Sequence, residues 1–294
     1  MKKIYLILPI LAGIMFASSG VFVRTLTQNG IDPATLLFLR FSLAIIPILI
    51  AIVATDKDLL KINLKDIPLF FVCAVCIVGL NLCYNESMNS IPLSLAAVLL
   101  SLAPIYVLIF AYILFKERIT LKKLVCMFLA IFGCVLMTGI FESSLNNIPL
   151  FGIVLGIGAG LFWAIYLMAS KKSIESGKHT FTILFYSIIF ITIALIPFTD
   201  FNQIAGFVSI NPALVILFLI LHSTFSFALP YILSTLSLNY MDSGVSSILL
   251  SGAEPFAALI FGLMFYQEIP TALMFCGFLL TVMSMIILGK NESA

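Results

Sequence analysis

Two side chains of opposite charge lie far inside apolar stretches of this 294-residue sequence. Arg40 lies in an apolar stretch near residues 33–54, and Glu254 lies in another near residues 243–266. A charge at the centre of a bilayer costs about 2.5–3.5 kcal/mol, so each charge needs a role if these stretches cross a membrane. Arg40 and Glu254 could bind the carboxylate and the ammonium group of one zwitterion. They could also pair with each other or with the backbone and hold helices together.

Glu254 and His222 are also candidates for proton coupling. Loss of water around a carboxyl group favours its protonated form, and histidine exchanges protons in the physiological pH range. His222 is followed by Ser223 and Thr224 in an otherwise apolar stretch. It could relay protons, contact a solute or simply hydrogen-bond to a neighbouring helix, and these alternatives stay open here.

Asparagines form a polar stripe in the first half of the sequence. Asn81, Asn85 and Asn89 recur at every fourth residue and therefore lie on one face of a helix. Such a face points to a cavity or a partner helix rather than to lipid, because unpaired amides are costly in hydrocarbon. Asn81 and Asn85 are therefore candidate solute ligands.

Aromatic and small residues share one further apolar stretch. Trp163 and Tyr166 project near its middle, where they could stack on a solute or pack against other helices. Gly152, Gly156 and Gly160 recur at four-residue spacing in the same stretch. A stripe of small residues lets a second backbone approach closely.

Two prolines, Pro104 and Pro255, fall near the middle of apolar stretches. A proline inside a helix removes one hydrogen bond and frees the carbonyl four residues earlier, here that of Leu100 or Ser251. Each site could be a hinge of a moving helix or a static kink.

Motifs for other kinds of chemistry are missing from the sequence. It contains no GxSxG, no HExxH and no DDxxD, and the CxxC of Cys73 and Cys76 has no second cysteine or histidine pair. We therefore predict no catalytic residues, no metal site and no cofactor. It also contains no GxxxxGK[ST] loop for a nucleotide, so uphill transport would need an ion gradient or solute exchange. A channel would call for a filter or a ring of charges, which the sequence does not offer.

The composition indicates that lipid is the solvent for much of the surface. Hydrophobic residues make up 62% of the chain and charged residues 10%, where soluble domains have roughly 45–50% and 25%. The mean hydropathy is +1.22. The net charge of +2 gives no reason to expect nucleic acid as a partner.

The apolar stretches predict an all-α membrane protein with ten transmembrane helices. A span needs roughly 20 apolar residues, and polar or proline-containing breaks separate the candidates. The spans are expected near residues 4–24, 33–54, 67–88, 92–115, 121–140, 149–170, 180–198, 211–235, 243–266 and 269–289. The links between them are short, so neighbouring helices are antiparallel.

The basic residues predict the orientation. With the N-terminus inside, 13 of the 15 lysines and arginines fall in cytoplasmic segments, while Arg24 lies outside and Arg40 lies within a helix. This asymmetry agrees with the positive-inside rule, so both termini are expected in the cytoplasm.

The two halves of the sequence repeat one another. Residues 87–101 match residues 237–251 at a constant offset, and Pro104 and Glu117 then align with Pro255 and Glu268. The repeats are assigned to residues 1–145 and 146–294. Each holds five helices, an odd number, so the second is expected to lie upside down relative to the first. Inverted repeats are typical of alternating-access transporters.

In both halves, the sequence resembles the EamA-type ten-helix transporters of the drug/metabolite transporter (DMT) superfamily. The residues that carry the resemblance are Arg40-Phe41-Ser42-Leu43-Ala44, Pro104, Lys116-Glu117-Arg118-Ile119-Thr120, Trp163-Ala164, Glu254-Pro255 and Glu268. The usual Trp-Gly of the first helix is Phe16-Ala17 in this sequence.

The resemblance implies a central cavity lined by helices 1–4 and 6–9, with helices 5 and 10 set back. It implies small organic solutes, often amino acids or other metabolites that leave the cell, as partners beside the lipid bilayer. We therefore expect export of amino acids or related zwitterions by alternating access, in a bacterial plasma membrane. Transport of cationic drugs or quaternary amines is the alternative, and an intramembrane enzyme is a distant one. A homodimer stays open.

Overall fold

The computed structural model describes residues 5–91, 93–138, 149–267 and 271–290. All secondary structure in this part of the chain is α-, 3-10 or π-helical, and these residues form no strand. The boundary predicted at residue 145 and the repeated Glu268 lie outside the described residues. The α-helices are α1 (Ile7–Gln28), α2 (Pro33–Thr55), α3 (Ile67–Ser90), α4 (Leu93–Leu100), α5 (Ala103–Phe115), α6 (Leu121–Met137), α7 (Leu150–Glu175), α8 (Thr180–Leu195), α9 (Phe201–Ile210), α10 (Pro212–Ser223), α11 (Leu229–Ser237), α12 (Ser243–Tyr266) and α13 (Ala272–Lys290). A π-helical turn, η6 (Thr224–Ala228), joins α10 to α11. Two short 3-10 turns, η2 (Lys57–Leu60) and η3 (Leu64–Asp66), precede α3, and a third, η5 (Ile196–Phe198), follows α8.

Most of these helices are long and apolar enough to cross a membrane. Within the described residues, eight stretches meet that condition. They are Pro33–Thr55, Leu64–Ser90, Leu95–Phe115, Leu150–Glu175, Thr180–Phe198, Pro212–Ser237, Ser243–Phe265 and Ala272–Gly289. The predicted spans near residues 4–24 and 121–140 correspond to the helices α1 and α6. An all-helical membrane fold is thus confirmed.

Helix α9 is a ten-residue element that the sequence analysis treated as part of a connection. Asp200 starts it by accepting hydrogen bonds from the backbone N–H groups of Asn202 (2.9 Å) and Gln203 (3.4 Å). Asn211 then ends it and starts α10. Ten residues are too few to cross a membrane, so a search for apolar spans of roughly 20 residues did not separate this helix.

The start of α2 is fixed by its own cap and by α9. The Asp32 carboxylate accepts hydrogen bonds from the backbone N–H groups of Ala34 (2.9 Å) and Thr35 (3.1 Å). Gln203 of α9 accepts from the Asp32 backbone N–H at 3.0 Å. Burial of Asp32 opposes its ionisation, but hydrogen bonds from Thr35, Ala34 and Gln203 outweigh it and lower the pKa of its carboxyl. A charged Asp32 therefore anchors the first turn of α2.

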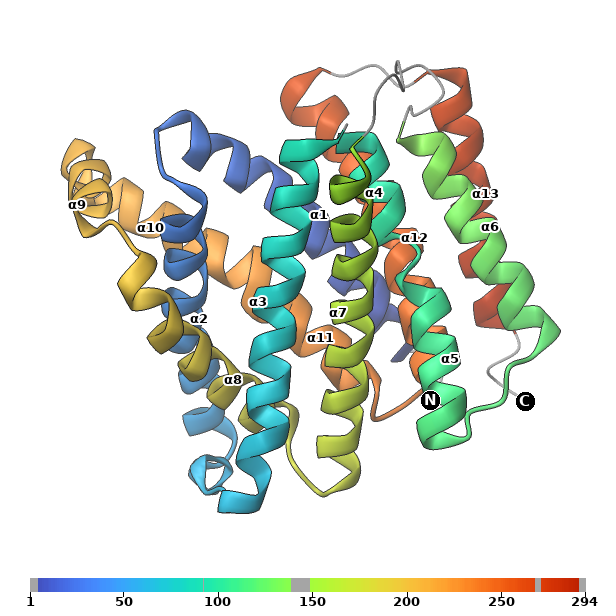
Figure 1. The fold of residues 1–294 in the computed structure, drawn as a ribbon, viewed down its shortest axis with the longest axis horizontal. Helices are drawn as coiled ribbons and strands as arrows, with labels where there is room; N and C mark the ends of the chain where they lie inside the picture. The colour runs from blue at the N-terminus through green and yellow to red at the C-terminus, as the bar shows by residue number, and fades with distance from the viewer. Residues whose placement is uncertain (1–4, 92, 139–148, 268–270, 291–294) are drawn as a thin grey trace.

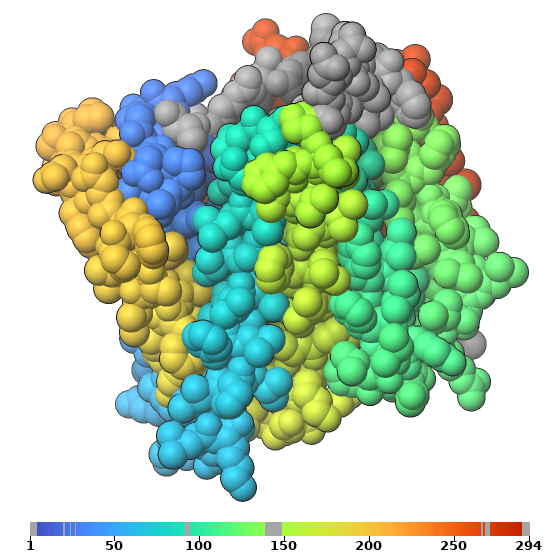
Figure 2. Space-filling view, in the orientation of Figure 1, coloured from blue at the N-terminus to red at the C-terminus, as the bar shows by residue number. Residues whose placement is uncertain are grey.

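The long helices stand side by side, with their connections at two ends of the bundle (Figure 1). Residues 56–66, 116–120 and 176–179 form one end, at the bottom of that view. We call this the lysine-rich end, because Lys57, Lys61, Lys65, Lys116 and Lys178 lie in these segments. Helices α3 and α7 lie next to each other in the middle of the visible face (Figure 2).

Glycines allow α7 to lie directly against α3 and α4. A side chain at Gly152 would meet Ile91 at 2.5 Å, and one at Gly156 would meet Leu99 at 2.6 Å. The Ser87 hydroxyl donates to the Gly152 carbonyl at 2.8 Å across the same contact. The close approach predicted for the glycine stripe is therefore present.

Helices α6 and α13 form a pair at the edge of the bundle (Figure 1). Their backbones touch at Gly133 and Gly277: a side chain on Gly277 would lie 2.5 Å from the Gly133 carbonyl oxygen, and one on Gly133 would lie 2.7 Å from that of Gly277. Their place at the edge agrees with the expectation that helices 5 and 10 are set back from the middle of the bundle.

The two prolines act differently on their helices. At Pro104 the helix is interrupted: α4 ends at Leu100, a turn follows at Ser101 and Leu102, and α5 begins at Ala103. Pro255, in contrast, lies inside the continuous helix α12. The structure thus shows a break in one repeat and an unbroken helix at the matching place in the other.

Candidate functional site

Arg40 lies in the interior between α1, α2, α3 and α10, with only 9% of its surface exposed. Its guanidinium donates to the Ser19 hydroxyl (2.7 Å), the Asn81 side-chain oxygen (3.3 Å) and Nε2 of His222 (3.4 Å). All three acceptors are neutral. Within the described part of the chain Arg40 forms no ion pair, so its charge has no carboxylate to balance it.

His222 is completely buried, and both of its ring nitrogens are used. Arg40 has only donors, so Nε2 of His222 must carry a lone pair, which places the proton on Nδ1. Nδ1 then donates to the Ser226 hydroxyl at 3.2 Å. The ring of Phe22 covers His222 at a centroid distance of 5.4 Å. In this conformation His222 orients Arg40 and has no free atom for a solute.

The local helix geometry explains why His222 and Ser226 meet. The π-helical turn η6 follows α10 directly, and π-turns often occur at functional sites. The neighbouring Ser223 donates to the Arg40 backbone carbonyl at 2.7 Å. The end of α10 is therefore attached to both the backbone and the side chain of Arg40.

Glu254 lies on α12 deep in the bundle. Helix α1 crosses beside it, since a side chain at Gly13 would lie 3.0 Å from the Glu254 backbone nitrogen. The carboxylate is near enough to Tyr84, Tyr231 and Cys134 to interact electrostatically with them. Glu254 is only partly buried despite this depth. Among the described residues it forms no ion pair and no side-chain hydrogen bond.

Tyr231 is close to both Arg40 and Glu254. It interacts electrostatically with Arg40 and with Glu254, and it lies beside Asn81. Arg40 and Glu254 themselves form no ion pair, so the alternative that they bind each other is wrong for this conformation. The interior therefore presents a guanidinium and a carboxyl group that do not pair with each other, and Tyr231 is close to both.

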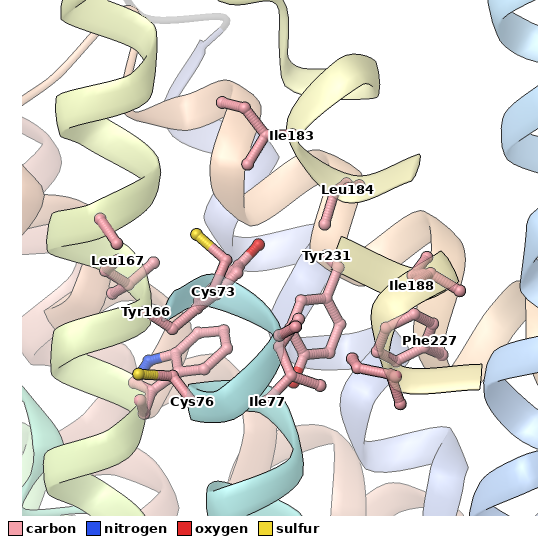
Figure 3. Packing of buried hydrophobic residues seen from close by; sticks show 14 of the residues in the cluster. Cys73, Cys76, Ile77, Tyr166, Leu167, Ile183, Leu184, Ile188, Phe227 and Tyr231 are labelled. Atoms are coloured by element: carbon pink, nitrogen blue, oxygen red, sulfur yellow. The ribbon is translucent and has the colours of Figure 1, made fainter. Parts of the chain in front are cut away.

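Five aromatic residues form one cluster with Tyr231. Its ring contacts Phe16 (5.2 Å), Trp163 (5.6 Å), Tyr166 (5.2 Å) and Phe227 (4.3 Å), as distances between ring centroids. Phe41 adds an edge contact with Phe227. Figure 3 shows Tyr231 and Phe227 in the core together with Tyr166, Cys73 and Ile77. We call Phe16, Phe41, Trp163, Tyr166, Phe227 and Tyr231 the aromatic cluster. Their rings fill the space around Tyr231.

The predicted aromatic ligands Trp163 and Tyr166 belong to this cluster. Trp163 is 6% exposed and Tyr166 1% exposed. The Tyr166 hydroxyl lies 2.6 Å from that of Thr235 on α11. Both residues are thus packed in this conformation, and a solute would reach them only after the cluster separates.

The asparagine stripe of α3 runs from the site to the end of the helix opposite the lysine-rich end. Asn81 contacts Arg40, and its amide group also donates to the Ile77 carbonyl at 2.8 Å. Asn85 is partly buried, and Asn89 is exposed and donates to Glu86 at 3.4 Å. Polarity and exposure therefore increase together from Arg40 outward.

Sequence reasoning missed Ser19, Ser226 and Tyr231. Tyr231 stands at the offset of the internal repeat from Asn81, so the repeat could have pointed to it. Ser19 and Ser226 gave no signal, because serines are common in membrane helices. No group of three or more His, Cys, Asp or Glu side chains that could hold a metal occurs in the described ranges.

Comparison with family models places both halves of the chain in one family. The model of the EamA-like transporter family matches residues 3–139 and again residues 150–290. A solved crystal structure superposes with a TM-score of 0.80 over 99% of both chains, at 14% sequence identity. At that identity the superposition concerns the fold alone.

Several curated proteins are similar in sequence. An uncharacterized transporter of Archaeoglobus fulgidus is 27% identical over 265 residues, 88% of this chain and 86% of that protein. One of Clostridium kluyveri is 25% identical over 228 residues, 74% of this chain and 72% of that protein. The threonine/homoserine exporter RhtA of Escherichia coli is 27% identical over 207 residues. That match covers 69% of this chain and 64% of RhtA.

Proposed function

The chain belongs to the EamA-like transporter family of the DMT superfamily, and from this premise we propose that it carries amino acids or related zwitterions across the membrane by alternating access. As a member of that family it is a multi-pass membrane protein that handles small solutes. The proposal adds the class of solute, the mechanism and the direction, which is export.

The observation that carries the proposal is the separation of Arg40 from Glu254. Each is held deep in the bundle without a partner of opposite charge among the described residues. A zwitterion supplies both missing partners, a carboxylate for Arg40 and an ammonium group for Glu254. The similarity to RhtA, named for threonine and homoserine export, favours an α-amino acid.

Site roles follow from the same contacts. We assign Arg40 and Glu254 to direct binding, and Asn81 and Asn85 to the polar path that leads to them. Glu254 is the candidate for proton coupling, because a carboxyl group without a fixed partner can take up a proton when the solute leaves. His222 serves Arg40 rather than the solute in the present conformation.

We propose ten membrane crossings in two inverted repeats, residues 1–145 and 146–294. The crossings are α1, α2, α3, α4 with α5, α6, α7, α8, α10 with α11, α12 and α13. Rocking of one repeat against the other would expose Arg40 and Glu254 to each side in turn. The break at Pro104 and the proline in α12 are the proposed hinges.

The orientation is testable by labelling. We propose that the lysine-rich end and both termini face the cytoplasm of a bacterial cell. The background is a variant without the exposed Cys276. A cysteine in place of the exposed Ser176 is expected to react with an impermeant maleimide only from the cytoplasm. A cysteine in place of the exposed Asn29 is expected to react only from outside. The opposite pattern of labelling would reverse the assignment.

Quaternary amines are the second candidate class of solute. Glu254 lies near Tyr84 and Tyr231, and an acid next to aromatic faces is a suitable site for an organic cation. In that case Glu254 alone would recognise the solute, and Arg40 would only join helices.

Counterflow in proteoliposomes tests the function. Vesicles loaded with unlabelled threonine or homoserine are expected to accumulate the labelled solute transiently and to saturate with its concentration. An intramembrane enzyme would move nothing, and a channel would conduct without counterflow. Counterflow of tetramethylammonium but of no amino acid would replace the zwitterion by the cation as the solute class.

A further inference from the structure

Glu117 joins elements from both repeats at the lysine-rich end. Its Oε1 accepts hydrogen bonds from the backbone N–H (3.0 Å) and the hydroxyl (2.8 Å) of Ser243, and Oε2 accepts from the backbone N–H of Gly244 (3.4 Å). Lys171 of α7 forms an ion pair with Oε1. We call these four residues the Glu117 cluster. Glu117 precedes α6, whereas its partners lie on α7 and α12.

Glu117 replaces the ordinary cap of α12. Asp242 stands at the capping position, but its side chain makes no capping hydrogen bond. It forms an ion pair with Lys123 of α6 at 2.5 Å instead. The free N–H groups at the start of α12, where the helix dipole is positive, are therefore satisfied by a carboxylate from the other repeat.

The ion pair of Lys171 and Glu117 is shielded from water. The two side chains are 13% and 7% exposed. The Lys171 ammonium also lies 5.1 Å from the centre of the Phe115 ring. The shielded charges of Lys171 and Glu117 attract each other more strongly than a pair on the surface would. If the lysine-rich end opens, water can replace their contacts.

The backbone places Glu117 there at a cost. Lys116 ends α5 in the left-handed conformation, with φ of 57°, which is strained for a residue with a side chain. The turn directs the chain back so that the Glu117 N–H donates to the Ala111 carbonyl at 3.2 Å. A strained turn is maintained only where neighbouring contacts over-determine it, and the Glu117 cluster supplies such contacts.

Other contacts between the repeats lie at the same end. Lys178 pairs with Asp66 at 2.6 Å. The Thr182 hydroxyl donates to the Leu59 carbonyl at 2.8 Å, and Tyr186 donates to that of Leu60 at 2.5 Å. The described ion pairs between the repeats are thus found at the lysine-rich end, while the asparagine stripe at the opposite end becomes more exposed.

We propose that the Glu117 cluster is the contact that holds the lysine-rich end closed and that its rupture opens the site on that side. The inference rests on the proposed alternating access. Helix α12 carries both Ser243 and Glu254, so release of its first turn from Glu117 frees the helix that binds the solute. Glu117 is therefore a positioning residue for Glu254 and does not touch the solute itself.

Cys73 provides a reporter for this opening. It is fully buried on α3, and its Sγ lies 3.7 Å from the hydroxyl of Ser170, which precedes Lys171. Figure 3 shows it between the labelled residues of α7 and those of α8. A maleimide can reach this thiol from the lysine-rich end only when the helices there separate. A variant that keeps Cys73 and replaces the other five cysteines by alanine gives one labelling site.

The experiment compares labelling rates of Cys73 in inside-out vesicles with an impermeant maleimide. Glu117→Gln and Lys171→Gln are each expected to raise the rate about tenfold, which corresponds to about 1.4 kcal/mol. The double variant should label no faster than the faster single one, because both changes remove the same contact. Lys61→Gln is the matched control, since its pair with Asp58 is exposed and within one loop.

The outcomes separate gating from mere stability and from the proposed function. Rates equal to that of Lys61→Gln in both single variants would overturn the inference. A lower melting midpoint for Glu117→Gln with unchanged Cys73 labelling would also overturn it, because the residue would then be structural. No solute is needed for this measurement, so a failure of threonine counterflow leaves its result readable.

Discussion

Replacement of Glu254 by glutamine is expected to slow threonine counterflow at least about a hundredfold without preventing folding. Removal of one partner of a buried charge pair costs about 3–5 kcal/mol, and about 2.7 kcal/mol corresponds to a factor of a hundred. Glutamine has nearly the same shape, and Glu254 makes no ion pair that the protein would lose. Initial rates of counterflow in proteoliposomes, with the melting midpoint as a test of folding, measure the effect.

Glu86→Gln is the matched control for this prediction. Glu86 is exposed near the end of α3, where its carboxylate accepts a hydrogen bond from Asn89, so its neutralisation should leave counterflow within about twofold, as for surface changes in general. Wild-type counterflow in the Glu254→Gln variant would remove Glu254 from the mechanism. If the Glu254→Gln variant carries threonine slowly but tetramethylammonium at the normal rate, Glu254 is required for amino acids alone.

Replacement of Arg40 by glutamine is expected to abolish the preference for solutes with a carboxylate. In the wild type, threonine should raise the melting midpoint more than 1-aminopropan-2-ol, which is threonine without its carboxylate. A charged hydrogen bond is worth roughly 1.5–3 kcal/mol, so the variant should bind threonine about ten to a hundred times more weakly. Binding of the amine should change little. Thermal-shift titrations with both compounds provide the two affinities.

Arg118→Gln serves as the control with the same change in charge. The Arg118 side chain is exposed at the lysine-rich end, and only its carbonyl is used, by Lys123. Equal stabilisation of the wild type by threonine and by 1-aminopropan-2-ol would defeat the role of Arg40 in binding. Arg40 would then be a residue that joins α1, α2, α3 and α10.

The sequence predicts the helical architecture well because its physical signal is local. Uninterrupted apolar stretches and polar breaks suffice to place α2, α3 and α12 within two residues of their observed ends, whereas α7 continues to Glu175, five residues beyond its predicted end. The same reasoning missed α9, because its ten residues between Asp200 and Asn211 are too few for a membrane span.

The site was predicted in part, because position along a helix indicates depth but not direction. Arg40, His222 and Glu254 could be placed near the membrane centre, but the sequence left open whether Arg40 pairs with Glu254. In the structure Arg40 and Glu254 form no ion pair, and Arg40 donates a hydrogen bond to His222 instead. The proposed stacking of a solute on Trp163 depends on which side is open, and a sequence does not specify a conformational state.

The role of Glu117 depends on contacts that local sequence rules do not reveal. The repeat identified the residue, but its partners Lys171 and Ser243 are 54 and 126 positions away. Left-handed Lys116 is unexpected from sequence, since glycine normally occupies such a turn. Gln267, at the matching place in the second repeat, has the same conformation, with φ of 55°. The recurrence shows that the repeats share backbone geometry as well as residues.

The backbone contact between Gly133 and Gly277 has a practical consequence for spectroscopy. With no side chain between them, α6 and α13 have little freedom to slide or tilt against each other. Spin labels on the outward faces of these two helices, for instance at the exposed Phe128 and Met283, should keep one separation throughout the transport cycle. That pair can serve as an internal ruler, against which distance changes elsewhere in the bundle are calibrated.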